Sequence, residues 1–122
     1  MEETIFQQLG EDGFERLIAA FYRRVKTDDL IGPMYPDDDW EGSEKRLRDF
    51  LVGRFGGPQR YIEERGHPRL RMRHAPFSIG EAERDRWLEL MSASLDEAEI
   101  ADAPKAVLLE FFSATAGFMR NQ

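Results

Sequence analysis

Cysteine is absent from this 122-residue sequence, and its absence removes several kinds of chemistry at once. The chain can form no disulfide, offers no thiolate to a metal and has no cysteine nucleophile. Long apolar runs are absent as well, since no stretch approaches the ~20 residues needed to span a bilayer. The first residues, MEETIFQQLG, lack the basic flank and apolar run of a secretory leader. We therefore expect a cytoplasmic protein that does not enter the membrane.

Histidine is scarce, and the common catalytic motifs are missing. The sequence has two histidines and no GxxxxGK[ST] loop, GxSxG elbow or HExxH pair, which leaves little material for phosphate-loop or triad chemistry. Glu64 and His67 have the ExxH spacing of di-iron carboxylate sites, but those sites need two such motifs on continuous helices. Here the motif occurs once, contains Gly66 and is followed by Pro68. We reject a di-iron site on these grounds.

Positive charge is in the minority. The chain has 17 Lys and Arg against 24 Asp and Glu, a net charge of −7. This balance makes nucleic acid and anionic membrane surfaces poor partners. The length is typical of one domain, so we expect a single domain over residues 1–122. A chain of this size can bury roughly two thirds of its unfolded surface and needs no covalent cross-links.

Between the glycine and proline breaks the sequence has helical periodicity. Asp12 and Glu15 have the spacing of a helix N-cap, Ser78 and Glu81 have that of another, and Pro104 suits a helix first turn. No segment alternates like a strand, so the expected fold class is all-α. The predicted buried stripes are Phe14, Leu17, Ile18, Phe21, Tyr22 and Val25; Leu47, Phe50 and Leu51; Arg84, Trp87, Leu88, Met91 and Leu95; and Val107, Leu108, Phe111, Phe112, Thr115 and Met119.

The stretch from Gly53 to Ile79 is long, broken by glycine and proline, and holds both histidines. Loops of this length in a small domain are usually functional or disordered. Interleaved aromatic and aliphatic residues argue against disorder. Pro68 permits a helix to start and Pro76 disfavours one at Ala75, which predicts a short helix of about two turns at most, with His74 among its last residues.

His74 has two interpretations at this point. It is either a half-buried histidine that bonds a backbone carbonyl or an imidazole that binds a metal. An imidazole, several aromatic side chains and nearby arginines are the components of a haem pocket. In such a pocket the imidazole binds the iron and guanidinium groups bind the propionates. His67 lies seven residues earlier and is separated from His74 by Pro68, so we expect it at the surface or the propionate edge.

The most specific pattern is GHPRLRMRHAPF, residues 66–77, followed by ERDRWL, residues 83–88. Together with Tyr22 in AAFYRRV, Tyr35 in GPMYPDDD and Tyr61 after Gly56-Gly57-Pro58, it resembles the second group of the truncated haemoglobins. The similarity runs from about Thr4 to Met119. One departure concerns Gly10, which is followed by Glu11 where the family commonly has paired glycines, and it bears on the packing of a short N-terminal helix.

The resemblance implies a two-over-two helical sandwich around haem b, with His74 as the proximal iron ligand. Tyr22, Tyr35 and Trp87 match the distal polar residues, and Ser43 and Leu47 match positions on the distal helix. Arg46 and Arg73 fall where propionate partners are expected, although a solvated role for Arg46 stays open. The full set expected to hold the cofactor is His74, Tyr35, Arg46, Leu47, Phe50, Tyr61, Arg73, Phe77 and Trp87.

Tyr22, Tyr35 and Trp87 would present two phenols and one indole to bound oxygen, whose partial negative charge such donors stabilise. Each has an alternative. Tyr22 could be a core tyrosine bonded to a carbonyl, Tyr35 ordinary loop packing and Trp87 a plain core residue. Ser43 could be a helix cap, or a small residue that keeps the distal entrance open.

The expected function is binding of oxygen and other diatomic ligands, with peroxidase-like or nitric oxide detoxifying chemistry as a further step that needs an unknown reductase. A haem carrier or sensor without turnover, and a cofactor-free helical module that uses the arginine-rich segment against an anionic partner, are the alternatives. The sequence leaves a homodimer open.

Overall fold

The computed structural model describes residues 3–122, so Met1 and Glu2 of the N-terminal stretch lie outside the described residues. All regular secondary structure in this part of the chain is helical, and it contains no strand. The elements are α1 (Ile5–Lys26), the short 3₁₀ helix η1 (Gly32–Met34), α2 (Trp40–Arg54), α3 (Arg60–Arg65), α4 (Leu70–His74), α5 (Glu81–Glu97) and α6 (Asp102–Met119). The all-α expectation is confirmed, and within residues 3–122 no helix is long and apolar enough to cross a membrane.

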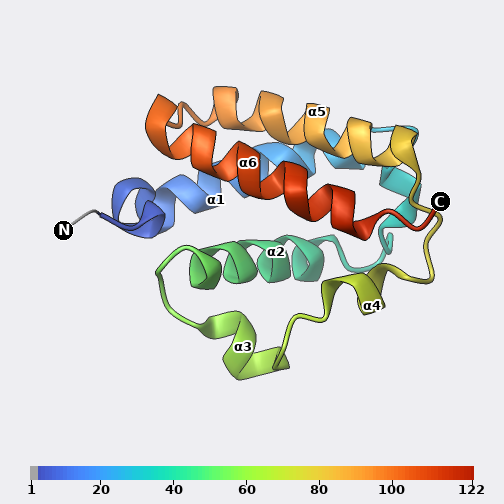
Figure 1. Ribbon diagram of the computed structural model, residues 1–122, viewed down its shortest axis with the longest axis horizontal. Helices are drawn as coiled ribbons and strands as arrows, with labels where there is room; N and C mark the ends of the chain where they lie inside the picture. The colour runs from blue at the N-terminus through green and yellow to red at the C-terminus, as the bar shows by residue number, and fades with distance from the viewer. Residues whose placement is uncertain (1–2) are drawn as a thin grey trace.

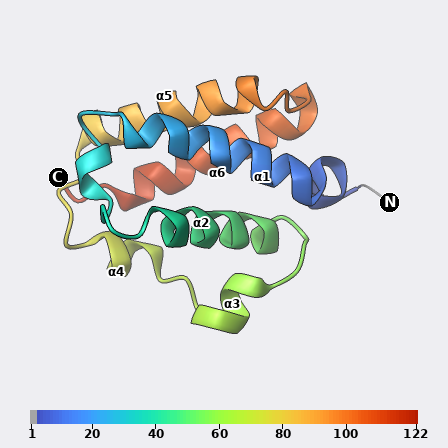
Figure 2. The ribbon, with the colours of Figure 1, turned by 180° about the vertical axis from the view of Figure 1, so that it is seen from behind.

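Two helix pairs pack against each other. α1 packs on α2, α5 packs on α6, and α1 also lies along α5. In Figure 1 and in the reverse view of Figure 2, α1, α5 and α6 form one side of the molecule and α2 the other, with α3 and α4 beyond α2. This arrangement is the expected two-over-two sandwich, and it leaves α2 and α4 facing the ends of α5 and α6.

Helix α1 starts earlier than its sequence pattern predicts. Thr4 caps it, because its hydroxyl accepts from the Gln7 backbone while the Gln7 side chain accepts from the Thr4 backbone. The helix then bends at Gly10, whose φ of 72° is favourable only for glycine. The predicted cap at Asp12 is therefore wrong, and Asp12 pairs with Arg16 instead. A single glycine makes this turn, although Glu11 follows it.

The core lies between α1, α2, α5 and α6, as the apolar stripes predict. Its fully buried side chains include Phe14, Leu17, Ile18, Phe21, Val25, Leu51, Met91, Leu95, Leu108 and Phe112. Val107 departs from this pattern, since it is 46% exposed. It lies at the solvent edge of α6, one residue before the buried Leu108.

Helix α5 starts at Glu81 rather than after Ser78. Its N-cap is Gly80, whose backbone N–H donates to the Glu83 carboxylate at 2.6 Å. The predicted Ser78–Glu81 capping box is therefore wrong, because glutamate at the third helical position already binds the free N–H. The consequence is that Arg84 and Trp87 lie in the first two turns of α5.

The long segment after Gly53 is not a single loop but contains α3 and α4. α4 has five residues and ends at His74, which confirms the short helix predicted from Pro68 and Pro76. The α3 helix ends at Gly66 with a φ of 75°, and Arg69 adopts a left-handed conformation just before α4. These two turns place His74 opposite α5 and α6.

Candidate functional site

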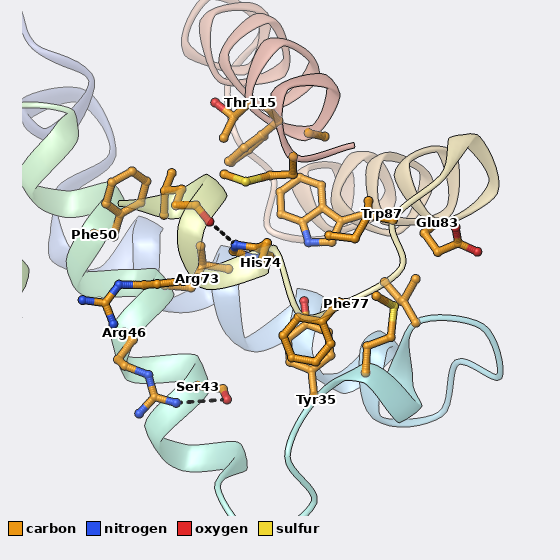
Figure 3. Close-up of a pocket in the computed structure, with 18 of the residues that line it drawn as sticks. Tyr35, Ser43, Arg46, Phe50, Arg73, His74, Phe77, Glu83, Trp87 and Thr115 are labelled. Carbon is orange, nitrogen blue, oxygen red and sulfur yellow. Dashed lines mark hydrogen bonds between the residues drawn. The ribbon is translucent and has the colours of Figure 1, made fainter. Parts of the chain in front are cut away.

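A cavity of about 380 Å³ lies between α2, α4, α5 and α6, with Tyr35 and its neighbours closing one end. Its volume is in the range of small-molecule and cofactor sites. Figure 3 shows His74, Trp87, Tyr35 and Phe77 converging on it from α4, α5 and the segments beside them. The cavity wall contains every residue proposed from the sequence for haem or its ligand: Tyr22, Tyr35, Ser43, Arg46, Leu47, Phe50, Tyr61, Arg73, His74, Phe77 and Trp87.

The cavity wall also contains residues that the sequence pattern predicts as core, and residues for which it predicts no role. Phe111, Thr115 and Met119 line the cavity from α6, although their spacing of four residues could equally describe a packed helix face. Leu70 and Ile79 complete the side near α4. Periodicity identifies the inward face of a helix but does not distinguish a packed neighbour from a cavity.

One ring nitrogen of His74 makes a hydrogen bond, and within the described residues the other makes none. Its Nδ1 lies 2.6 Å from the backbone oxygen of Leu70, and this bond is dashed in Figure 3. A carbonyl oxygen only accepts, so Nδ1 carries the proton and Nε2 keeps its lone pair. This is the tautomer of a metal-binding imidazole whose second nitrogen is oriented by a backbone carbonyl.

The imidazole fits a metal held mainly by a cofactor. Residues 3–122 contain no group of three or more His, Asp or Glu side chains that could hold a bare metal ion. The cavity offers one free imidazole nitrogen, apolar and aromatic walls and arginines, which suits an iron whose other ligands come from a porphyrin. His67 does not line the cavity, and its Nδ1 accepts from the Arg69 backbone N–H at 3.0 Å.

Tyr22 is buried and its hydroxyl is already bonded. It donates to the backbone carbonyl of Ser43 at 3.0 Å, which is the carbonyl-bonded alternative considered above. Ser43 itself is the fourth residue of α2 and is buried, and the N-cap of that helix is Asp39. The capping interpretation of Ser43 is therefore wrong. Tyr22 lines the cavity, but its hydroxyl proton is used in the hydrogen bond to α2.

Tyr35 and Trp87 form the remaining donor pair. The Trp87 indole N–H lies near the Tyr35 hydroxyl, and within residues 3–122 neither group donates to a carbonyl or carboxylate. Burial raises the pKa of Tyr35 to about 12, and the neighbouring Trp87 indole opposes part of the rise. Tyr35 is therefore a neutral O–H donor at neutral pH, with its proton available to a ligand in the cavity.

Arg46 and Arg73 lie at one edge of the cavity in Figure 3. Arg46 donates to Asp39 at 2.9 Å and to the Ser43 hydroxyl at 3.3 Å. Arg73 donates through Nε to the Pro68 carbonyl at 2.8 Å, which leaves its terminal nitrogens for an anion. Arg71, by contrast, lies over the Phe118 ring and does not line the cavity. Two arginines thus flank the edge where a carboxylate-bearing cofactor would meet solvent.

A family model described as bacterial-like globin matches residues 4–121. The chain belongs to the bacterial-like globins. Its relatives place it in the second group of truncated haemoglobins, and one of them is the group 2 truncated hemoglobin YjbI of Bacillus subtilis. That protein is 36% identical over 117 residues, which cover 96% of this chain and 88% of the relative.

Solved haemoglobin structures have the same fold. The hemoglobin of Chloroflexus aurantiacus has a TM-score of 0.95 and 46% identity, covering 99% of this chain and 100% of that one. A truncated oxygen-avid haemoglobin from Bacillus subtilis has a TM-score of 0.92 and 33% identity, covering 98% and 100%. Membership of the globin family implies a haem, and the cavity below α6 is the site whose residues fit one.

Proposed function

We propose that this globin holds haem b in the 380 Å³ cavity, where His74 Nε2 would bind the iron and Arg46 and Arg73 would bind the propionates. The support is the Nδ1 bond to Leu70, which presents a lone pair to the cavity, and the two arginines at one edge. Bound there, the haem iron would supply diatomic-ligand binding and electron transfer. The apolar wall of Leu47, Phe50 and Phe77 would exclude water from its faces.

Oxygen is the ligand that the distal residues suit best. Bound oxygen carries partial negative charge, which pre-placed N–H and O–H donors stabilise in a site of low dielectric. Trp87 and Tyr35 provide such donors, and the Tyr35 proton is free of other acceptors within the described chain. This donor pair is the observation that carries the function of tight oxygen binding. The relative from Bacillus subtilis, described as oxygen-avid, supports the same function.

Tight binding implies that oxygen is released slowly. Slow release favours a reaction of the bound oxygen over oxygen transport, because a carrier must release oxygen at its working concentration. One arrangement favours peroxidase-like oxidation in particular. Tyr35 stacks on Trp40 with ring centroids 5.6 Å apart, and Trp40 lies at the half-buried start of α2. Oxidisable rings therefore lead from the cavity toward solvent. The overall reaction would reduce one hydrogen peroxide to two waters while two phenol molecules each lose one electron and one proton.

Steady-state oxidation of a phenol by hydrogen peroxide tests this step. The haem-loaded protein should exceed free haem at equal concentration, and Tyr35→Phe or Trp40→Phe should lower the rate severalfold because each removes an oxidisable link. Rates equal to free haem, or indifferent to both substitutions, would contradict peroxidase-like function. Conversion of nitric oxide to nitrate by the oxygen-loaded protein would then be the redox function to measure, with an external electron donor to restore ferrous iron.

A further inference from the structure

An ion pair outside the cavity joins the two segments that carry the donor pair. Arg86 Nη1 lies 2.6 Å from Asp28 Oδ1, and Arg86 directly precedes Trp87 on α5. Asp28 lies two residues after α1, at the start of the turn that leads to Tyr35. Its side chain is only 8% exposed, whereas the Arg86 side chain is 34% exposed.

The second oxygen of Asp28 fixes the turn itself. Oδ2 accepts from the backbone N–H groups of Leu30 at 3.1 Å and Ile31 at 2.9 Å. One carboxylate therefore binds α5 with one oxygen and the turn with the other. A buried carboxylate with three donors is strongly held, since each of these bonds is charge-assisted.

Two backbone bonds connect this carboxylate to Tyr35. Gly32 N–H donates to the Asp28 carbonyl at 3.2 Å, and Tyr35 N–H donates to the Gly32 carbonyl at 3.1 Å. Gly32 is required for the close packing, because a Cβ there would lie 2.6 Å from the Val25 carbonyl oxygen. The chain from Asp28 to Tyr35 is thus a series of bonded turns with little freedom to shift.

We propose that Asp28 and Arg86 are positioning residues for the ligand donors: the pair joins the Tyr35 turn to α5 and so sets the separation of the Tyr35 hydroxyl from the Trp87 indole. Neither residue lines the cavity. The inference rests on the proposed oxygen-binding function and adds residues that control it from outside the site. Hydrogen-bond strength depends steeply on geometry, so a small shift of either segment weakens the donor network.

Arg86→Gln is the most direct variant, because it removes the ion pair and leaves the Asp28 bonds to Leu30 and Ile31 intact. Arg86→Lys keeps the charge and serves as the partial rescue. Glu97→Gln is the matched control, since Glu97 joins α5 to α1 at the far end of the helix through Arg24 at 2.8 Å and lies away from the cavity. Trp87→Phe reports the effect of losing a donor outright.

The haem-loaded variants are compared by oxygen release, by the C–O stretch of the carbon monoxide complex, by the Trp87 indole ¹H–¹⁵N signal and by thermal unfolding. We expect Arg86→Gln to release oxygen on the order of fivefold faster, which is the size of effect seen between residues that contact each other. The C–O stretch and the indole signal should both shift in the direction that a weaker donor bond produces. Arg86→Lys should lie between Arg86→Gln and wild type. Glu97→Gln should lower the unfolding temperature without moving the ligand readouts.

The inference is overturned if Trp87→Phe accelerates release while Arg86→Gln changes only the unfolding temperature, as Glu97→Gln does. If Trp87→Phe itself leaves release unchanged, the donor role in the proposed function fails, and the positioning role fails with it.

Discussion

The Tyr22 hydroxyl donates its proton to the Ser43 backbone carbonyl, 3.0 Å away, and so connects α1 to α2 across the distal side of the cavity. Burial and the neighbouring Tyr35 raise the pKa of Tyr22 far above that of a free tyrosine. The Tyr22 and Tyr35 rings meet edge to face with centroids 5.7 Å apart. The two adjacent phenols therefore differ: the Tyr22 hydroxyl holds a helix, and we propose that the Tyr35 hydroxyl faces the ligand.

This difference predicts separate outcomes for two tyrosine variants. Tyr22→Phe should lower the free energy of unfolding by about 1 kcal/mol, because a buried hydrogen bond is lost, and should change oxygen release little. Tyr35→Phe should speed oxygen release and change stability less. Chemical denaturation and stopped-flow release measure the two quantities on the same samples. Faster release in Tyr22→Phe than in Tyr35→Phe would reverse the assignment.

Trp87→Phe should speed oxygen release by roughly tenfold to a hundredfold, which corresponds to the ~1.5 to 3 kcal/mol of a hydrogen bond to a charged group. The substitution keeps most of the ring volume and removes the N–H. Trp40→Phe is the matched control, since its indole donates to Asp37 at 3.3 Å and does not line the cavity. Equal release rates in the two variants would show that the Trp87 N–H contributes nothing specific.

Alkaline titration tests the state of Tyr35. Its pKa is raised to about 12 in the folded protein, so the neutral hydroxyl is favoured by folding. The stabilisation is fully present below the unfolded pKa of about 10 and is lost as the pH rises through about 12. In ultraviolet difference titration, the tyrosinate signal that Tyr35→Phe removes should appear only above about pH 11. A signal near pH 10 would mean that the hydroxyl is not buried.

The sequence predicts the ends of α4 better than those of α1 and α5, for local physical reasons. Proline has no N–H to continue a helix, so Pro68 and Pro76 limit the short helix that ends at His74, although Ala75 before Pro76 keeps a right-handed helical backbone. Caps are less certain because several residues compete for the same N–H groups. Thr4 caps α1 instead of Asp12, and Glu83 bonds Gly80 at the start of α5.

The spacing of apolar residues predicts which site residues lie on inward helix faces, but it does not predict the hydrogen bonds among them. Tyr22 and Trp87 lie on inward helix faces, as their spacing indicates. The partner of each donor depends on how two helices approach, so the Tyr22 bond to Ser43 could not be separated from a ligand contact. The ion pair of Asp28 with Arg86 joins residues 58 apart in sequence and has no local signal.

Arg73→Met should weaken haem retention by about twofold to fivefold, the range of an exposed ion pair. The substitution keeps the length of the side chain and removes the charge at the cavity edge. Arg71→Met is the control, because Arg71 lies over the Phe118 ring and does not line the cavity. Transfer of haem to an excess of acceptor apoprotein measures retention. Equal transfer rates for both variants would contradict the proposed propionate contact.

Haem binding by the two single-histidine variants tests the assignment of the iron ligand most directly. His74→Ala removes the imidazole whose Nδ1 bonds Leu70 and whose Nε2 is free, whereas His67→Ala removes an exposed ring that accepts from Arg69. We expect His67→Ala to retain haem and the wild-type absorption spectrum, and His74→Ala to lose stable haem and to recover it in part with added imidazole. Loss of haem from His67→Ala, with retention and an unchanged spectrum in His74→Ala, would rule out His74 as the iron ligand.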